Sequence, residues 1–587
     1  MDNPQDLHQS GNEDTAPELR RPESVSDAAQ PALRPTSNCT DLSAETAITR
    51  PSLEVLALQK VHFGRDLSSH DQTEQTFFPP TDASFTSTGL SDDGVASGLT
   101  RQQLGVHEPE KSDDTLVGEY QQKWQPAHPP SELSQLPSKR FKPWWRRVRH
   151  DILNAYQRLF AIVVLGNAIA VIVVLVKRRN ATPFGPSLAN VATATAANIS
   201  ATILMRQEFV INSFYTVLCW TPHCTPLRFR RLIAKFYHFG GVHSGCATSS
   251  TAWFILYTIL LTKQYASNEF RSVAVMTLTY VLVALLCLIC LFAIPGFRFK
   301  SHNTFESFHR FGGWLAVALF WAQVLLVSVL QHKSSQSRAS SLSSSSSSSP
   351  SSSLGSILAH TPAFWMLITI TLFIILPWLR LRRVQAWPEV LSGHAVRIHF
   401  NYTRIGAVLG IRIANSPLKE WHPFASIPEA DGSSFSIIVS DAGDWTKKQI
   451  QHPKYSYWVR GIPLSGVLRM ACVFRRVVVV TTGSGIGPCL SLLIAHPLPC
   501  RILWSSKNPL GIYGEGTIDQ VTRADPDAMI INTQATGRPD MVGLTYHLYK
   551  ESGAEAVFVI SNIGLTNKLV YAMESRGVPA YGPIWDS

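Results

Sequence analysis

The sequence predicts a multi-domain protein: a disordered N-terminal tail, a six-helix transmembrane bundle, an antiparallel β-barrel and an α/β domain. Three observations predict this order. The N-terminal part is polar, the middle contains apolar blocks near the ~20 residues that cross a bilayer, and the C-terminal part turns to short alternating segments and a strand that enters a glycine-rich turn. The predicted boundaries are 1–138, 139–383, 384–472 and 473–587.

The charge of the chain indicates a membrane rather than a nucleic acid as its partner. The formal net charge is +11 and the pI is about 9.2, although only 16% of the residues are charged. The basic residues gather beside the apolar blocks, which is typical of membrane orientation and not of a nucleic-acid surface. We therefore expect a lipid bilayer, and no nucleic acid, among the partners.

The predicted tail is rich in Ser, Pro, Asp, Glu and Gln and does not begin with a charged-then-apolar signal region. It ends in KRFKPWWRRVRH (139–150), where six basic residues surround Trp144 and Trp145. Such a stretch fits an anionic inner leaflet, with the indoles at the depth of the headgroups. A solvated basic linker is the alternative.

Six apolar blocks are the predicted transmembrane spans. They lie at 159–176, 187–205, 241–262, 272–294, 311–331 and 358–379.

Basic residues in the loops predict the direction of these spans. Arg230 and Arg231 lie between spans two and three, and Arg382 follows span six, on the same side as the tail. We expect a multi-pass protein of the plasma membrane or an endomembrane with both termini in the cytosol; only the basic residues 177–179 disagree. The serine-rich segment 340–353 and a weak glycosylation motif at Asn180 would then lie outside.

Two histidines stand where spans three and five begin. His243 and His309 would both lie at the cytosolic face, and two imidazoles at one depth are what a six-coordinate haem iron requires. Histidines at helix ends are more often interfacial, so this spacing alone is a thin indication.

The C-terminal part predicts two small domains. The runs AVRIHF, AVLGIRIA and SFSIIVS alternate as strands of an antiparallel β-barrel do. A buried strand, RRVVVV (475–480), then runs into TTGSGIGP and an apolar helix, an arrangement that suits a pyrophosphate at a helix N-terminus. Later strand-like runs at 501–506, 528–533 and 555–561 alternate with helical segments, which predicts a parallel α/β sheet.

Together, the six spans, HPFAS and TTGSGIGP resemble the ferric reductase and NADPH oxidase superfamily, whose C-terminal module is ferredoxin-reductase-like. The stretches HSGC, HRFGGW, GDWT, WSSKNP, TGRPDM and RGVPAYGPIWDS resemble, more narrowly, fungal TmpA-type integral membrane oxidoreductases. The resemblance covers roughly 150–587. It implies that the barrel binds FAD and that the α/β domain binds NADPH or NADH.

The resemblance also implies roles for particular residues. In the family that the chain resembles, a hydroxyl group near the flavin assists the arrival of the hydride, and Ser426 is the catalytic residue expected here. The alternative is that this segment is only a proline turn at the end of a strand. Ser505, Lys507 and Arg538 would meet a 2′-phosphate, which favours NADPH. Trp585, or Tyr581, would stack on the flavin, with core packing as the alternative for Tyr581. The expected lining of the flavin and pyrophosphate sites is His422, Pro423, Phe424, Ala425, Ser426, Gly483, Ser484, Gly485, Ile486, Gly487 and Pro488.

Two departures from the family's pattern limit these implications. Where a second pair of haem ligands would stand, the chain has Leu256 or Tyr257 and Ala322 or Gln323, so at most one haem b is expected, on the cytosolic side. Its ligands would be His243 and His309, with His238 competing for the first position. The usual Cys-Gly-Pro beside the nicotinamide is absent, and Ser561 or Asn562 takes its place, Ser561 being the second catalytic residue expected.

The expected function is electron transfer from NAD(P)H through FAD to an unidentified acceptor, with one inner haem as an optional relay. A nucleotide- or redox-sensing membrane protein with little turnover is the alternative. A transporter with a regulatory domain is weaker, because the spans lack acidic residues.

Overall fold

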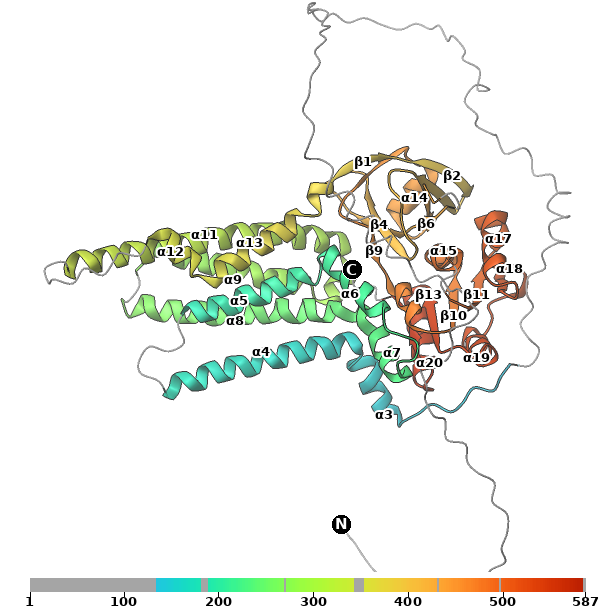
Figure 1. Ribbon diagram of the computed structural model, residues 1–587, viewed down its shortest axis with the longest axis horizontal. Helices are drawn as coiled ribbons and strands as arrows, with labels where there is room; N and C mark the ends of the chain where they lie inside the picture. The colour runs from blue at the N-terminus through green and yellow to red at the C-terminus, as the bar shows by residue number, and fades with distance from the viewer. Residues whose placement is uncertain are drawn as a thin grey trace, which may run out of the picture. The chain divides into compact units, whose positions relative to one another are not determined.

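The computed structural model describes residues 133–180, 188–268, 271–342, 353–429, 432–495 and 498–583, with backbone only at 177–180 and 338–342. All of them belong to one unit of the chain, His107–Ser587 (Figure 1). The predictions for the tail before residue 133, for Asn180, for most of the serine-rich segment and for Trp585 lie outside what is described.

Helices make up the first part of this unit, and each predicted span coincides with one of the long helices. Small residues let two of them approach closely: a Cβ added to Gly241 would lie 2.3 Å from the Tyr156 carbonyl oxygen. The helices are α3 (Pro143–Arg146), η2 (Arg147–Ile152), α4 (Ala155–Asn180), α5 (Leu188–Leu204), α6 (Glu208–Cys219), α7 (Leu227–Ile233), η3 (Ala234–Phe239), α8 (Gly240–Ala266), α9 (Val273–Phe292), α10 (Pro295–Lys300), α11 (His302–Leu342), α12 (Leu354–Ala359), α13 (Pro362–Ile375) and η4 (Trp378–Arg380).

By length and composition, five helices of the described part could cross a membrane, or six if α5 and α6, bent by 69°, count as one span. A polar node ties three of them together, because Asn167 Oδ1 accepts from both Trp253 Nε1 and Asn198 Nδ2 at 2.9 Å. The helix α4 exposes Ile162, Leu165 and other apolar side chains along its length. The bilayer itself stays a prediction.

Two antiparallel sheets follow the helices and enclose one apolar core, in which Phe400 and Phe435 stack at 5.3 Å. The sheet orders are β1-β8-β4-β5, with β9 on β4, and β2-β3-β7-β6. The elements are β1 (Arg382–Gln385), β2 (Trp387–Ser392), β3 (Ala395–Phe400), β4 (Leu409–Ala414), β5 (His422–Ala425), β6 (Ile427–Pro428), β7 (Phe435–Ser440), α14 (Asp444–Gln451), β8 (Ser456–Val459), β9 (Leu464–Ser465) and η5 (Val467–Val473).

A parallel sheet with the order β12-β11-β10-β13-β14 ends the chain. The central strand is buried on both faces, as its run of four valines predicts. The elements are β10 (Val477–Thr482), η6 (Gly483–Gly485), α15 (Ile486–Ala495), β11 (Cys500–Ser506), α16 (Pro509–Tyr513), α17 (Glu515–Ala524), β12 (Met529–Asn532), α18 (Thr533–Thr536), α19 (Met541–Glu551), β13 (Ala556–Ile560), α20 (Ile563–Glu574) and β14 (Ala580–Tyr581).

Sequence reasoning missed α6, α7 and η3, which occupy the supposed basic loop between spans two and three. Arg230 of α7, expected to mark the membrane side, is instead 3% exposed and forms two hydrogen bonds with the Glu555 carboxylate, at 2.6 and 2.8 Å. Glu208 of α6 is equally buried, pairs with Arg412 of β4 and accepts from the Ile462 amide at 2.7 Å. These helices therefore dock the β-sheets.

Removing the Glu555 charge should destabilise the protein, because Arg230 would keep a buried charge without its partner. We expect Glu555→Gln to cost about 3 kcal/mol, measured as a lower midpoint of thermal unfolding. Glu551→Gln is the matched control, since the Glu551 side chain is 53% exposed and its ion pairs are long. Equal midpoints for the two variants would contradict this account of the docking.

The stability of the fold should also fall as the pH rises, because one histidine of the second sheet loses its proton. Hydrogen bonds to Glu389, and then to Glu429, raise the pKa of His399 from 6.5 to about 9. A raised pKa stabilises the fold fully below 6.5, and this contribution is lost as the pH rises to about 9. With screening by solvent the loss is on the order of 1 kcal/mol.

The test is the pH dependence of chemical unfolding. The wild-type protein should lose stability between pH 6.5 and 9 relative to His399→Gln, and parallel curves would refute the assignment.

Candidate functional site

The strand order reverses beside β10, which is the topology at which parallel α/β sheets generally bind ligands. The chain moves from β10 to β11 and β12 on one side, then crosses to β13 and β14 on the other. Helices that leave the carboxyl ends of β10 and β13 in opposite directions leave a gap between them, where α/β proteins bind ligands. The residues at this gap are the predicted glycine turn, 483–488, and Ser561 with Asn562.

The glycine turn has no room for a side chain at Gly485. A Cβ on Gly485 would lie 2.4 Å from the Ile560 carbonyl oxygen and 2.6 Å from Thr481 Oγ1, and Gly483 has a φ of +52°. The Gly483 carbonyl accepts from Trp504 Nε1 at 3.0 Å, which fixes the turn against β11. The turn leads directly into α15, whose N-terminal N–H groups suit an anion.

Side chains around the turn come from several strands. Tyr513 of α16 hydrogen bonds with Ser484 and Ser506, and burial raises the pKa of Tyr513 to about 12, so that its hydroxyl stays protonated. Sequence reasoning missed this tyrosine, because only the fold brings α16 to the turn. Lys507 and Arg538 are exposed after the carboxyl ends of β11 and β12.

Ser505 and Ser561 are less accessible than expected. Ser505 is buried in β11, and the Ser561 hydroxyl is hydrogen bonded to that of Thr482.

The predicted flavin segment forms β5, and its imidazole stacks on an indole. The rings of His422 and Trp445 are 4.0 Å apart and inclined by 24°. Within the described part of the chain, His422 Nε2 and Trp445 Nε1 are buried without a hydrogen-bond partner. Burial lowers the pKa of His422, which keeps it neutral at pH 7. Pro423 is exposed, and Phe424 and Ala425 are half-buried beside them.

Two expected flavin contacts are placed elsewhere. Ser426 is completely buried and donates its hydroxyl proton to the Leu409 carbonyl at 2.7 Å, so it does not present this hydroxyl to a ligand. Tyr581 is also buried, stacks on Phe558 at 5.2 Å and donates to the Arg231 carbonyl, so core packing is the observed role. Both positions are decided by packing that the motifs do not encode.

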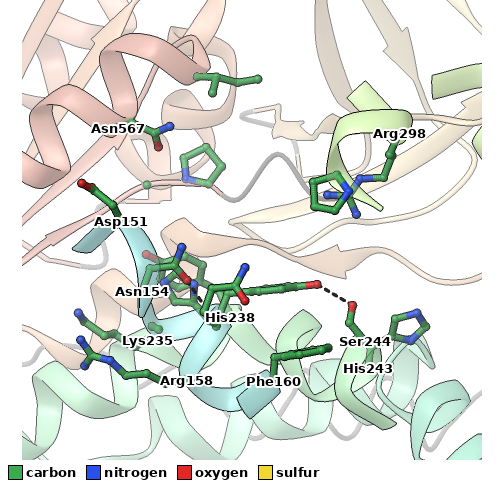
Figure 2. A pocket seen from close by; sticks show the side chains of 18 of the residues that line it. Asp151, Asn154, Arg158, Phe160, Lys235, His238, His243, Ser244, Arg298 and Asn567 are labelled. Carbon is green, nitrogen blue, oxygen red and sulfur yellow. Dashed lines mark hydrogen bonds between the residues drawn. The ribbon is translucent and has the colours of Figure 1, made fainter. Parts of the chain in front are cut away.

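A second cavity, of about 960 Å³, lies between α4, α8, α11 and α20. Figure 2 shows it from close by, with Asp151 and Arg158 before and within α4, His243 on α8, Arg298 on α10 and Asn567 on α20. Cationic side chains outnumber acidic ones in its lining. They are Arg149, Arg158, Arg206, Lys235 and Arg298 against Asp151 and Glu574.

Glu574 balances part of this charge. Burial acts to raise its pKa, but hydrogen bonds from His150 and Lys235 lower the pKa of Glu574 to about 2. It is therefore ionised throughout the physiological range.

The structure brings the two predicted haem-ligand histidines together in this cavity. The ring centroids of His243 and His309 are 6.4 Å apart, and the rings are inclined by 56°. His243 Nδ1 lies 2.9 Å from the Thr202 carbonyl oxygen, which directs its other ring nitrogen away from α5. In the described residues His309 Nδ1 is buried without a partner, and His238 lines the same cavity.

Comparison with known proteins identifies relatives of a different kind from those expected. The family model "Adenylate-forming reductase 03009, C-terminal domain" matches residues 467–587. Adenylate-forming reductase 03009 of Coprinopsis cinerea is 42% identical over 75% of this chain and 41% of its own length. Adenylate-forming reductase 06235 of the same fungus is 41% identical over the same shares. The chain thus spans about two fifths of the curated relatives it matches.

Two solved structures that match each cover about a third of this chain. A ferredoxin NADP+ reductase from Neisseria gonorrhoeae with bound FAD and NADP is 11% identical and covers 35% of this chain and 99% of its own, with a TM-score of 0.29. The Amycolatopsis cytochrome P450 reductase GcoB is 11% identical and covers 35% and 71%, with a TM-score of 0.26. TM-scores this low support no conclusion about the fold or the function of this chain.

These matches correct the resemblance drawn from the motifs. The matched curated relatives are adenylate-forming reductases, and not members of the ferric reductase and NADPH oxidase superfamily. Short stretches such as HPFAS and TTGSGIGP follow from what a strand end or a tight turn must do, so they do not resolve one family from another. The comparisons support neither the haem nor the membrane.

The packing of the glycine turn predicts the effect of one methyl group. Gly485→Ala should lower the thermal midpoint of the α/β domain by roughly 5 °C, since the added Cβ meets backbone and must displace β13. Gly516→Ala is the control, because its Cβ meets no atom within 4 Å and alanine favours the helix α17. Intrinsic tryptophan fluorescence, to which the buried Trp504 contributes, follows the transition, and an unchanged midpoint for Gly485→Ala would contradict the described turn.

Proposed function

We propose that the chain is an FAD-dependent NAD(P)H oxidoreductase. The observation that carries this proposal is the reversal of strand order beside β10, which puts the glycine turn after β10 and Ser561 after β13 at neighbouring strand ends. A pyridine nucleotide would place its pyrophosphate on the turn and the N-terminus of α15. The names of the matched reductases agree with redox chemistry of this class.

The residues of β5 fit a flavin. His422 Nε2 and Trp445 Nε1 are two buried ring nitrogens without partners in the described chain, and the isoalloxazine ring or the phosphates of FAD would supply hydrogen-bonding atoms for them. Trp445 lies in the first turn of α14, which adds N–H groups that suit a phosphate. When bound, FAD would accept a hydride and release electrons. The protein orients the two cofactors and excludes water.

The choice of NADPH over NADH is supported by charge. Lys507 and Arg538 follow β11 and β12 at the edge of the sheet that carries the turn, and both side chains are exposed to a ligand. Cations at this edge suit a 2′-phosphate. We therefore expect a preference for NADPH.

The helical part is proposed to span a membrane, with both termini and the two β-domains on the cytosolic side. The exposed apolar length of α4 supports this, because a lipid-facing helix buries such a surface in the bilayer. The acceptor is unidentified, and the lipid bilayer is the expected partner.

One haem b is proposed as a relay between the flavin and the helices. Two imidazoles that ligate one metal at ~2 Å each place their ring centroids roughly 6 Å apart, which the pair of His243 and His309 matches. The neighbouring Arg310 donates to the carbonyls of Leu418 and Lys419, just before β5. The proposed flavin segment and the proposed haem ligand are thus held by the same helix, α11.

A sensor that binds the nucleotide with little turnover is the second candidate. It is favoured by Ser561, a residue that is 5% exposed and whose hydroxyl is hydrogen bonded to Thr482, so it is poorly placed to act on a nicotinamide.

Retention of flavin tests the proposal. The whole protein, purified gently in detergent, should retain FAD, and Trp445→Ala should lower the occupancy about tenfold by removing the Nε1 donor and the ring that packs on His422. His394→Ala is the matched control, because His394 is exposed on the same domain. Full occupancy in Trp445→Ala would place the flavin elsewhere, and a protein that never binds FAD would refute the function. The same spectra should show a Soret band that His309→Leu abolishes.

A further inference from the structure

A third cavity, of about 230 Å³, lies inside the helical part, between α5, α8, α11 and α13. These helices run side by side in Figure 1 and contact one another. The cavity is distinct from the histidine cavity, because Gln323 in its wall is 14 residues, or about 21 Å along α11, beyond His309. Neither the proposed flavin nor the proposed haem uses it.

Most of the cavity wall is apolar or already satisfied. The hydroxyl groups of Thr195 and Ser328 donate to carbonyls of their own helices, at 3.0 and 2.8 Å. Two buried polar side chains in the wall, Gln323 and Tyr257, remain to be explained. Both are at least 95% buried.

Neighbouring groups fix the orientation of the Gln323 amide. Thr279 donates its only hydroxyl proton to the Val275 carbonyl at 2.7 Å, so it can only accept from Gln323, whose Nε2 lies 2.8 Å away. Tyr257 lies beside Gln323 in the same wall of the cavity. Within the described chain no donor reaches Gln323 Oε1, although this atom is buried. An acceptor left in this state is costly, so a ligand that donates to it would bind more tightly.

The cavity therefore matches a hydroxyl group. A carbonyl ligand could only accept and would face the Gln323 oxygen unfavourably. A hydroxyl group can donate to Gln323 Oε1 and accept from the Tyr257 hydroxyl beside it.

The rest of the cavity matches a ring. Phe254 and Phe320 line it and meet edge to face at 5.2 Å, and Phe254 stacks with Tyr257 at 5.5 Å. Such a wall offers both faces and edges to an aromatic ligand. A volume of 230 Å³ exceeds the ~150 Å³ that holds one benzene, so a single substituted ring fits.

We propose that this cavity binds a lipophilic monocyclic phenol, a class that includes hydroquinones, through its hydroxyl group and Gln323. The site is independent of the proposed reductase chemistry, because binding alone defines it. Water is the competing occupant, since it can also donate to Gln323.

The test compares 4-propylphenol with propylbenzene, which differ only in the hydroxyl group. Dissociation constants for the detergent-purified whole protein are measured by ligand-observed NMR. We subtract uptake by Ala196→Phe, whose new ring fills the cavity from α5. The phenol should bind about tenfold more tightly than propylbenzene, and Gln323→Leu should bring the two constants within about twofold of each other.

Three results would overturn the proposal. They are equal affinities of the two ligands for the wild-type protein, a preference that survives Gln323→Leu, and binding that Ala196→Phe does not reduce. Absence of binding by either ligand would assign the cavity to water. The comparison of ligands on the wild-type protein needs no variant, so a folding defect in Gln323→Leu leaves the test decisive.

Discussion

The position of β10 in its sheet is the constraint on which the proposed chemistry depends. The chain passes from β10 to β11 on one side of the sheet and later crosses to β13 on the other side. No connection between neighbouring strands therefore covers the carboxyl end of β10. Because the strand is buried on both faces, its end cannot shift, and the turn at Gly483–Gly485 is held between Trp504 and Ile560. The proposed anion site would therefore be made mainly of backbone, in a turn that packing holds in place.

The docking helices connect this site to the helical part. Arg230 reaches Glu555, just before β13, while Glu208 ties α6 to β4 and Arg310 ties α11 to the segment before β5. Each of the two β-domains is thus anchored by buried or half-buried charges to helices that continue into the apolar part. Because Arg310 follows His309 in α11, the segment before β5 is tied to the helix that carries one histidine of the cavity.

Periodicity and turn chemistry were sufficient to predict much of the fold. The long helices, the strands β3, β4 and β7 and the succession of β10, turn and α15 are where the sequence pattern places them. Residues whose role is set by distant partners were not predictable. The charge of Arg230 reads as a membrane flank, yet its meaning comes from Glu555, 325 positions away. Ser426 and Tyr581 look like site residues by motif, but local packing buries them, and Tyr513 joins the turn only through the fold. The resemblance to the ferric reductase and NADPH oxidase superfamily was wrong for a related reason. The motifs describe local backbone requirements that unrelated families share.

The most direct test is the absorption spectrum of the FAD-loaded whole protein before and after NADPH is added without oxygen. If the glycine turn seats the nucleotide against the flavin of β5, the flavin band should bleach within seconds, and NADH should act more slowly. A bound flavin whose spectrum NADPH leaves unchanged would contradict the account and favour a sensor.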